Sequence, residues 1–121
     1  MTKVTRRPDC GNSPKNARAE EIALALMGVG ALPEGTLAEA ATWDFAGGAL
    51  TGRAEIRTCA VAQTADAITV EQVVTHGRGG SVSGRVTRGG DTYLFCHVIR
   101  FTSAAARDIA QLVSFEHPGD A

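Results

Sequence analysis

A histidine in the middle of an aromatic stretch is the residue of this sequence best placed to do chemistry. The segment Asp91–Phe101 alternates as a β-strand does, and side chains two positions apart in a strand point to the same face. His97 therefore shares its face with the apolar side chains Tyr93, Phe95, Ile99 and Phe101. Histidine titrates near neutral pH, so in such a wall it can exchange a proton or donate to a developing oxyanion.

His97 also has a purely structural interpretation. A core histidine is satisfied by a hydrogen bond to a neighbouring strand, and Gln111 or Ser114 could supply that bond. Cys96 points to the opposite face, so it cannot share a metal ion with His97. The three cysteines form no pair and no zinc-binding spacing with the histidines. The sequence therefore predicts no metal and no cofactor.

Asp44 is the second candidate for acid–base chemistry. A carboxylate beside Trp43 could be a base whose pKa is raised by apolar surroundings. The alternation of Trp43, Asp44 and Phe45 favours an outward position for Asp44, although a shift of one residue in register would reverse this.

Two further titratable residues have open positions. His76 ends a predicted strand before a glycine turn, so it lies either at a pocket rim or in solvent. Glu116 would share a strand face with Leu112 and Ser114 and could face His97, or it could be exposed near the chain terminus. With the side chains above, the predicted pocket comprises Trp43, Phe45, His76, Tyr93, Phe95, Ile99, Leu112, Ser114 and Glu116.

Composition narrows the class of protein. A chain of 121 residues with 44% hydrophobic residues can bury the core of one domain. Its net charge of −1 and the lack of interleaved basic and aromatic residues argue against nucleic acid as a partner. No apolar run approaches the roughly eighteen residues of a membrane span, so no membrane role is expected. The odd, scattered cysteines and the absence of a signal peptide predict a reduced, cytoplasmic protein.

The order of predicted elements indicates an α+β fold. The helices begin at Ser13-Pro14, at Thr36 and at Thr51, and the strands follow mainly in the second half. The expected elements are helices 13–27, 36–41 and 51–63 and strands 41–46, 67–76, 81–87, 91–101 and 109–116. Residues 1–12 read as a flexible arm, 13–117 as a single domain and 118–121 as a tail. A curved antiparallel sheet wrapped around the N-terminal helix, with two shorter helices, would form a cone with a pocket at its mouth.

Several motifs in this order resemble the nuclear transport factor 2-like superfamily, which includes ketosteroid isomerases and SnoaL-like cyclases. They are Trp43–Phe45, Leu50–Ile56, Val74–Gly77 with Gly84, and His97–Phe101 followed by Ile109. The resemblance covers about residues 13 to 116. It implies a cone-shaped α+β barrel, an apolar pocket and a homodimer.

The resemblance does not bring steroid isomerase chemistry with it. The general-base Asp of those isomerases aligns with Phe45, and their first-helix Tyr aligns with apolar residues such as Ile22 and Leu26. Their oxyanion-binding Asp aligns with His97. Two of three functional positions are therefore apolar, and only His97 remains.

Two functions of different classes follow. The first is a SnoaL-like protein that binds a small apolar or carbonyl-containing molecule. Whether it also acts as an isomerase, cyclase or hydrolase assisted by His97 is left open by the sequence. The alternative is a non-catalytic homodimeric module that works through its outer sheet face, where Leu94, Val98 and Val73 are too apolar for full solvation.

Overall fold

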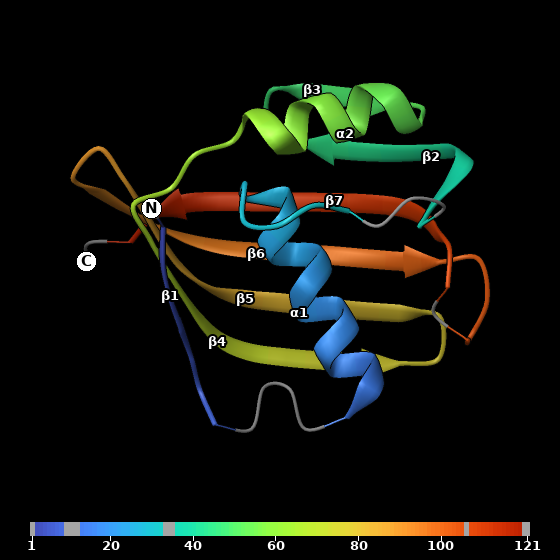
Figure 1. Ribbon diagram of the computed structural model, residues 1–121, viewed down its shortest axis with the longest axis horizontal. Coiled ribbons are helices and arrows are strands. Elements are labelled where there is room, and N and C mark those ends of the chain that lie inside the picture. The colour runs from blue at the N-terminus through green and yellow to red at the C-terminus, as the bar shows by residue number, and fades with distance from the viewer. Residues whose placement is uncertain (1, 9–12, 33–35, 106, 120–121) are drawn as a thin grey trace.

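A curved, seven-stranded sheet forms the frame of the molecule, and a long helix crosses its concave face (Figure 1). The computed structural model describes residues 2–8, 13–32, 36–105 and 107–119. Its elements are β1 Lys3–Arg6, α1 Pro14–Leu26, β2 Leu37–Phe45, β3 Gly48–Thr51, α2 Arg53–Ala62, β4 Ala67–His76, β5 Gly79–Arg88, β6 Asp91–Phe101 and β7 Ile109–Pro118. The strand order is β1-β4-β5-β6-β7-β2-β3, so β6, which carries His97, is the central strand.

Strands β4 to β7 form the antiparallel meander that the alternation predicts. The bounds of β4 and β6 agree with the prediction, and β5 and β7 are each longer than expected. The β5–β6 turn contains Gly89 and Gly90, whose φ angles are 56° and 88°. Both angles are positive, as a two-residue hairpin turn of this type requires, which explains the Gly-Gly pair.

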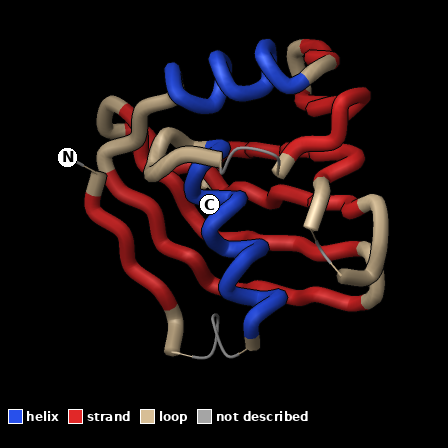
Figure 2. The backbone as a smooth tube through the Cα atoms, turned by 45° about the vertical axis from the view of Figure 1, so that its right-hand side comes forward, coloured by secondary structure: helices blue, strands red, loops and turns tan. Residues whose placement is uncertain are grey.

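The sheet is mixed and open, which corrects the expectation of an antiparallel barrel. β1 pairs with β4 in parallel, and β2 pairs with β7 in parallel. Among the described residues β1 and β3 lie at opposite ends of the strand order, so the sheet does not close on itself (Figure 2). Alternation reveals that a segment is a strand but not which strand lies beside it, so the sequence could not show these two parallel pairs.

The short helix expected at Thr36–Ala41 is wrong, because the segment is the first half of β2. Leu37 and Ala41 are fully buried there, and β2 lies between β7 and β3. The pairing of Leu37 with Ile109 of β7 and the burial of Leu37 and Ala41 outweigh the helical propensity of the Ala- and Glu-containing sequence. The molecule therefore has one shorter helix, α2, among its described residues, where two were expected.

The N-terminal segment contains β1, where a loose arm was expected. Its four residues pair with Ala67–Val70 of β4, and the Arg6 side chain forms an ion pair with Glu20 of α1. β1 is mostly exposed and has no apolar stripe, so the sequence carries no strand signal there. Residues 9–12 of the expected arm and 120–121 of the expected tail lie outside the described residues, and Pro118 belongs to β7.

Helix α1 begins as predicted. The Ser13 side chain accepts a hydrogen bond from the backbone N–H of Asn16 at 3.1 Å, and Pro14 is the first helical residue. The predicted apolar stripe is buried against the sheet and consists of Ala19, Ile22, Ala23 and Leu26. This packing fixes the C-terminal end of α1 over the middle of the sheet (Figure 1).

Helix α2 begins after Gly52, one residue later than the expected cap Thr51, which ends β3. Ile56 and Ala60 are buried as predicted, and Cys59 is partly buried against the core. α2 packs beside β2 and near the C-terminal end of α1 (Figure 2). The ends of the two helices and the inner face of the sheet thus surround one space.

Candidate functional site

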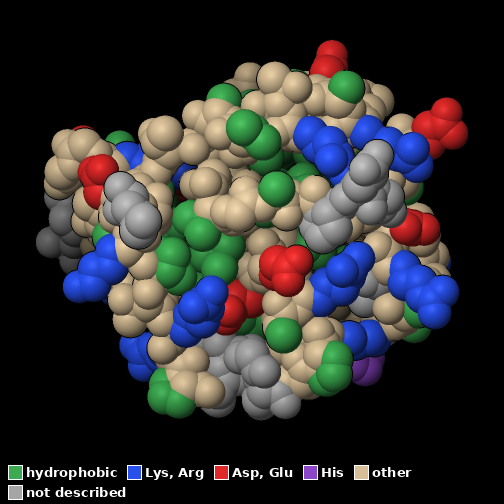
Figure 3. Space-filling model, in the orientation of Figure 1, with side chains coloured by type: hydrophobic (Ala, Val, Ile, Leu, Met, Phe, Trp, Pro, Cys, Tyr) green, Lys and Arg blue, Asp and Glu red, His purple; other side chains and the backbone are tan. Residues whose placement is uncertain are grey.

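A cavity of about 250 Å³ lies between the C-terminal ends of α1 and α2 and the inner face of the sheet. Figure 3 shows hydrophobic side chains gathered in a hollow left of centre. Five residues of the predicted pocket line it, namely Trp43, Phe45, His97, Ser114 and Glu116. They come from β2, β6 and β7, which are consecutive in the sheet as β6-β7-β2.

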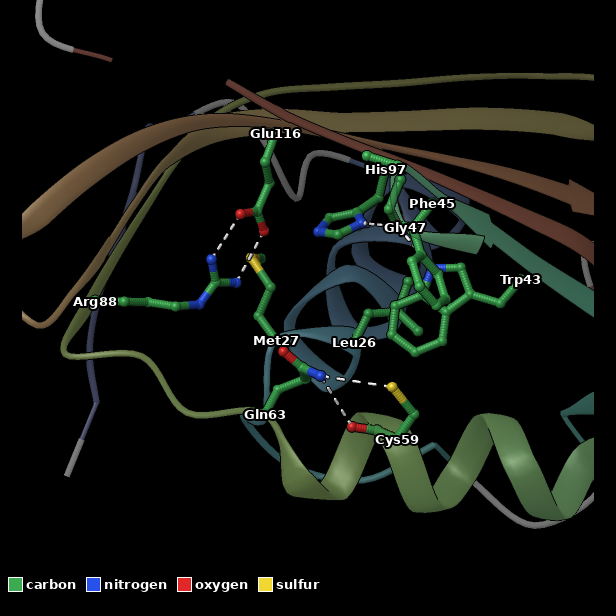
Figure 4. A pocket seen from close by; sticks show the side chains of 12 residues that line it. Leu26, Met27, Trp43, Phe45, Gly47, Cys59, Gln63, Arg88, His97 and Glu116 are labelled. Carbon is green, nitrogen blue, oxygen red and sulfur yellow. Dashed lines mark hydrogen bonds and ion pairs between the residues drawn. The ribbon is translucent and has the colours of Figure 1, made fainter. Parts of the chain in front are cut away.

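His97 is the buried polar residue of this cavity. It is 2% exposed, and its ring is tilted against that of Phe95 with 5.3 Å between the ring centres. Its Nδ1 lies 2.7 Å from the Ser114 hydroxyl oxygen. Its Nε2 is buried and has no hydrogen-bond partner among the described residues. In Figure 4 the ring directs this free nitrogen into the cavity.

Trp43, Ser114 and His97 form a chain of hydrogen bonds across three neighbouring strands. The Trp43 indole Nε1–H donates to the Ser114 hydroxyl oxygen at 2.8 Å, and that oxygen is the one bonded to His97. The register places His97 directly opposite Ser114, and Trp43 opposite Leu112 on the other side of β7. The chain therefore results from strand pairing, and His97 both lines the cavity and contacts Ser114.

Burial lowers the pKa of His97 from its ordinary value of 6.5 to about 4. Desolvation is the largest cause, because it penalises the charged imidazolium. Glu116 raises this pKa and Arg88 lowers it, so these two charges oppose one another. The imidazole is therefore neutral at physiological pH, with one N–H donor and one acceptor nitrogen.

An ion pair closes one end of the cavity. Arg88 of β5 donates to both carboxylate oxygens of Glu116 of β7, at 2.7 and 2.9 Å. Their side chains are 27% and 32% exposed, so water reaches this pair and screens it. Figure 4 shows the pair on the opposite side of the cavity from Trp43, with His97 between them. Glu116 thus lines the same cavity as His97, although the residue as a whole is exposed.

The sequence did not predict the part of the cavity wall formed by the C-terminal ends of the two helices and by the last residue of β5. Leu26 and Met27 of the α1 end, Gln63 after α2, and Arg88 before the hairpin turn all line the cavity. Their proximity depends on how α1 crosses the sheet, which alternation does not reveal. One signal was present in Gly28, because a Cβ atom there would lie 2.1 Å from the carbonyl oxygen of Gln63. A glycine with a φ of 90° after a helix marks this close approach.

Six of the predicted site residues do not line the cavity. Asp44 lies on the outer face of β2, where its carboxylate accepts a hydrogen bond from Gln111 at 3.1 Å, as the favoured register indicated. His76 is exposed at the end of β4. The others share the inner face but lie outside the cavity wall: Tyr93 is partly buried, and Phe95, Ile99 and Leu112 are core. Alternation identifies the inner face, and the position of α1 decides which part of it is left open.

No group of three His, Cys, Asp or Glu side chains comes together to hold a metal ion within residues 2–8, 13–32, 36–105 and 107–119. Over the same residues, neither helix is long and apolar enough to cross a membrane.

The fold recurs in solved structures at low sequence identity. A nuclear transport factor 2-like protein of unknown function from Burkholderia xenovorans LB400 matches with a TM-score of 0.63 and 10% identity, over 71% of this chain and 68% of that one. A candidate ketosteroid isomerase from Kribbella flavida DSM 17836 matches with a TM-score of 0.60 and 20% identity, over 88% and 72%. A de novo designed protein with a curved β-sheet matches with a TM-score of 0.64 and 15% identity, over 86% of each chain.

The sequence itself gives no such match, since no protein-family profile and no curated protein matches it. At these identities the structural likeness establishes the fold and nothing finer. It confirms the resemblance first indicated by the motifs around Trp43 and His97: this chain has the nuclear transport factor 2-like fold.

Proposed function

We propose that this protein is a SnoaL-like binder of a small, largely apolar molecule that carries a carbonyl group. The apolar body of the ligand would pack against Leu26, Met27, Trp43 and Phe45, and its oxygen would meet His97 Nε2. The observation that carries this proposal is the unpartnered, buried Nε2 at the wall of an otherwise mostly apolar cavity.

The energetics of that nitrogen favour a ligand. A buried polar atom without a partner costs about 1 to 3 kcal/mol, and a ligand oxygen at Nε2 would recover part of this cost. Ligand sites combine an apolar wall with a few placed polar groups, and this cavity has that composition. Its volume of about 250 Å³ is near the lower end of such sites, so the ligand must be small.

A reaction is a finer part of the same proposal. His97 would assist an isomerase, cyclase or hydrolase step by acid–base exchange or by stabilising an oxyanion. A carboxylate base is not offered to the ligand, because Asp44 faces outward and Glu116 is held by Arg88. Phe45 lines the cavity where the related isomerases carry their base, so double-bond isomerisation of that type is not proposed.

The experiment is a thermal-shift screen of the purified protein with small cyclic ketones and lactones, each paired with the hydrocarbon of the same shape. A ligand that binds only the folded state stabilises that state, by about 2.7 kcal/mol when its concentration is a hundred times Kd. The melting temperature rises as a result. We expect ketones to stabilise the protein more than their hydrocarbons do. Cys59→Phe, whose ring would extend from α2 into the cavity (Figure 4), should abolish the shift.

Asp44→Asn is the control, because Asp44 lies on the outer face of β2, away from the cavity. It should leave the shift unchanged. If no carbonyl compound of fitting size raises the melting temperature, or if the shift survives Cys59→Phe, the cavity is not the binding site. Incubation of each stabilising ketone with the protein, followed by product analysis in wild type and His97→Gln, decides whether binding leads to a reaction.

A second proposal is that two copies of the chain associate through the outer face of the sheet. Phe115 is 58% exposed there and stands opposite Cys96, and the next outer pair along the same strands is Val98 opposite Val113. This face is apolar across β6 and β7, and such patches mark contact surfaces. If this surface alone carried the function, the protein would be a non-catalytic homodimeric module.

Sedimentation velocity tests the association. Phe115→Glu should convert a dimer to a monomer, whereas Val61→Glu should not, because Val61 is equally apolar and 70% exposed but lies on α2. A wild type that sediments as a monomer at high protein concentration would contradict the association. Loss of ligand binding in a monomeric Phe115→Glu protein would favour the module over the independent pocket.

A further inference from the structure

We propose that Ser114 and Trp43 are positioning residues that hold His97 in one tautomer, with its proton on Nε2. The cavity then presents a hydrogen-bond donor and selects ligands by an acceptor oxygen such as that of a ketone, ester or lactone. This inference rests on the proposed function only for the ligand class, since the tautomer is a property of the protein alone.

The positions of the donors and acceptors lead to this tautomer. The indole Nε1–H of Trp43 can only donate, so the Ser114 oxygen accepts from it at 2.8 Å. A hydroxyl has one proton, and the second neighbour of this oxygen is His97 Nδ1 at 2.7 Å. When the hydroxyl donates to Nδ1, the two hydrogen bonds run in the same direction, from Trp43 to Ser114 and from Ser114 to His97. The proton of the neutral ring is then on Nε2.

The reverse arrangement leaves more polar groups without a partner. If Nδ1–H donated to the Ser114 oxygen, that oxygen would accept twice and its own proton would need another partner. Over the described residues the hydroxyl has only its two bonds, to Trp43 and to His97. The reverse arrangement would therefore leave both the Ser114 proton and the Nε2 lone pair unpaired, whereas the proposed one leaves only Nε2–H unpaired, so the proposed tautomer is favoured.

The Nε2–H donor has no acceptor among the described residues. Nε2 is buried without a partner among the described residues, and Figure 4 shows it directed into the cavity. The carboxylate of Glu116 lines the same cavity and is bonded to Arg88, but it forms no hydrogen bond with Nε2. An oxygen supplied from within the cavity is therefore the natural acceptor.

This tautomer separates two roles that histidine can play. Nε2 already holds its proton and Nδ1 is occupied by Ser114, so the ring is not placed to remove a proton from a ligand. It can polarise a carbonyl oxygen by donating a hydrogen bond, with no proton transferred. The charges of Arg88 and Glu116 compensate one another, so the cavity favours an uncharged ligand over an amine or a carboxylate.

Nitrogen-15 NMR of the ligand-free, histidine-labelled protein tests the tautomer directly. At pH 7 we expect His97 Nε2 to show the shift of a protonated ring nitrogen and Nδ1 that of an unprotonated one. A protonated Nδ1 would overturn the proposal. Neither result depends on ligand binding, so failure of this inference is distinguishable from failure of the proposed function.

Variants test the positioning roles. Ser114→Ala should mix the two tautomers and reduce the preference for a ketone over its hydrocarbon about tenfold, the loss of one hydrogen bond of about 1.4 kcal/mol. Ser114→Thr keeps the hydroxyl and should restore both the spectrum and the preference. Trp43→Phe keeps a ring but removes the donor, so it should move both readouts in the direction of Ser114→Ala. An unchanged His97 spectrum in folded Ser114→Ala would contradict the role of Ser114.

Discussion

The two polar ends of the cavity differ in how they are held. At one end His97 is buried, neutral and bonded through Ser114 to Trp43. At the other, Arg88 and Glu116 form a charged pair that is about a quarter to a third exposed. Burial makes the first end sensitive to any missing partner, whereas water replaces lost partners at the second. The buried end is thus suited to selecting a ligand by its polar group. The charged end, where water can replace a lost partner, should be insensitive to the ligand.

The largest loss of stability should come from the close approach of Gly28, after α1, to Gln63, after α2. Gly28 has a φ of 90°, and a Cβ atom there would collide with the Gln63 carbonyl oxygen. The left-handed conformation costs about 1 to 2 kcal/mol and the overpacking about 1 to 3, so Gly28→Ala should lose about 2 to 5 kcal/mol in urea unfolding. Gly30→Ala is the control, because its φ of 76° is similar but its surroundings are open. An equal loss in both variants would mean that the close approach to Gln63 is unimportant.

Acid should weaken the buried end next. The pKa of His97 is about 4 when folded and near 6.5 when unfolded, so below pH 6.5 the unfolded chain binds the extra proton. The contribution is fully present above pH 6.5 and is lost as pH falls to 4, by about 3 kcal/mol in total. Glu116, Arg88 and Cys59 line the same cavity and are present in both of the proteins to be compared. The measured quantity is therefore the difference in unfolding free energy between wild type and His97→Gln across pH, and a difference that does not change with pH would contradict it.

Removal of the linking hydroxyl should have a moderate effect. Ser114→Ala leaves the buried Trp43 N–H and His97 Nδ1 without their partner, which should cost about 1 to 3 kcal/mol in urea unfolding. Ser114→Thr should recover most of this loss. If Ser114→Ala were as stable as wild type, the hydrogen-bond chain would not contribute to the fold.

The smallest effect is expected at the charged end. Glu116→Gln removes one charge of a solvent-screened pair, so the unfolding free energy should fall by less than about 1 kcal/mol. The difference from wild type should shrink further in high salt. A loss as large as that of Ser114→Ala would show that the two ends are not distinct in the way proposed.

Much of the meander was predictable, because its strands carry their own signals. β6 alternates over its whole length, and Gly89-Gly90 fixes the turn before it, so the alternation showed which side chains share a face with His97. The family resemblance indicated that this face points inward. The same alternation placed Trp43 inward and Asp44 outward, as the structure has them. Alternation of this kind depends only on the residues of one segment, so it could be recognised without knowing the contacts between distant segments.

The remainder depends on contacts between distant segments. The parallel pairing of β2 with β7 turned an Ala- and Glu-containing segment around Leu37 into a strand, against its helical propensity. The inner face of β6 divides into core at Ile99 and cavity at His97 only because α1 ends where it does. Met27 and Arg88 joined the site for the same reason, and no pattern in the sequence gives the position of a helix on a sheet.

The most direct test of the central claim is an NMR titration of the labelled protein with a small cyclic ketone that stabilises it. A ketone oxygen bound at His97 should shift the Nε2–H proton and nitrogen signals of this residue in proportion to occupancy. The matched hydrocarbon should bind more weakly and leave the Nε2–H signals nearly unchanged. A ketone that binds without shifting His97, and instead perturbs the outer face around Phe115, would contradict the claim that this cavity and its buried imidazole are the ligand site.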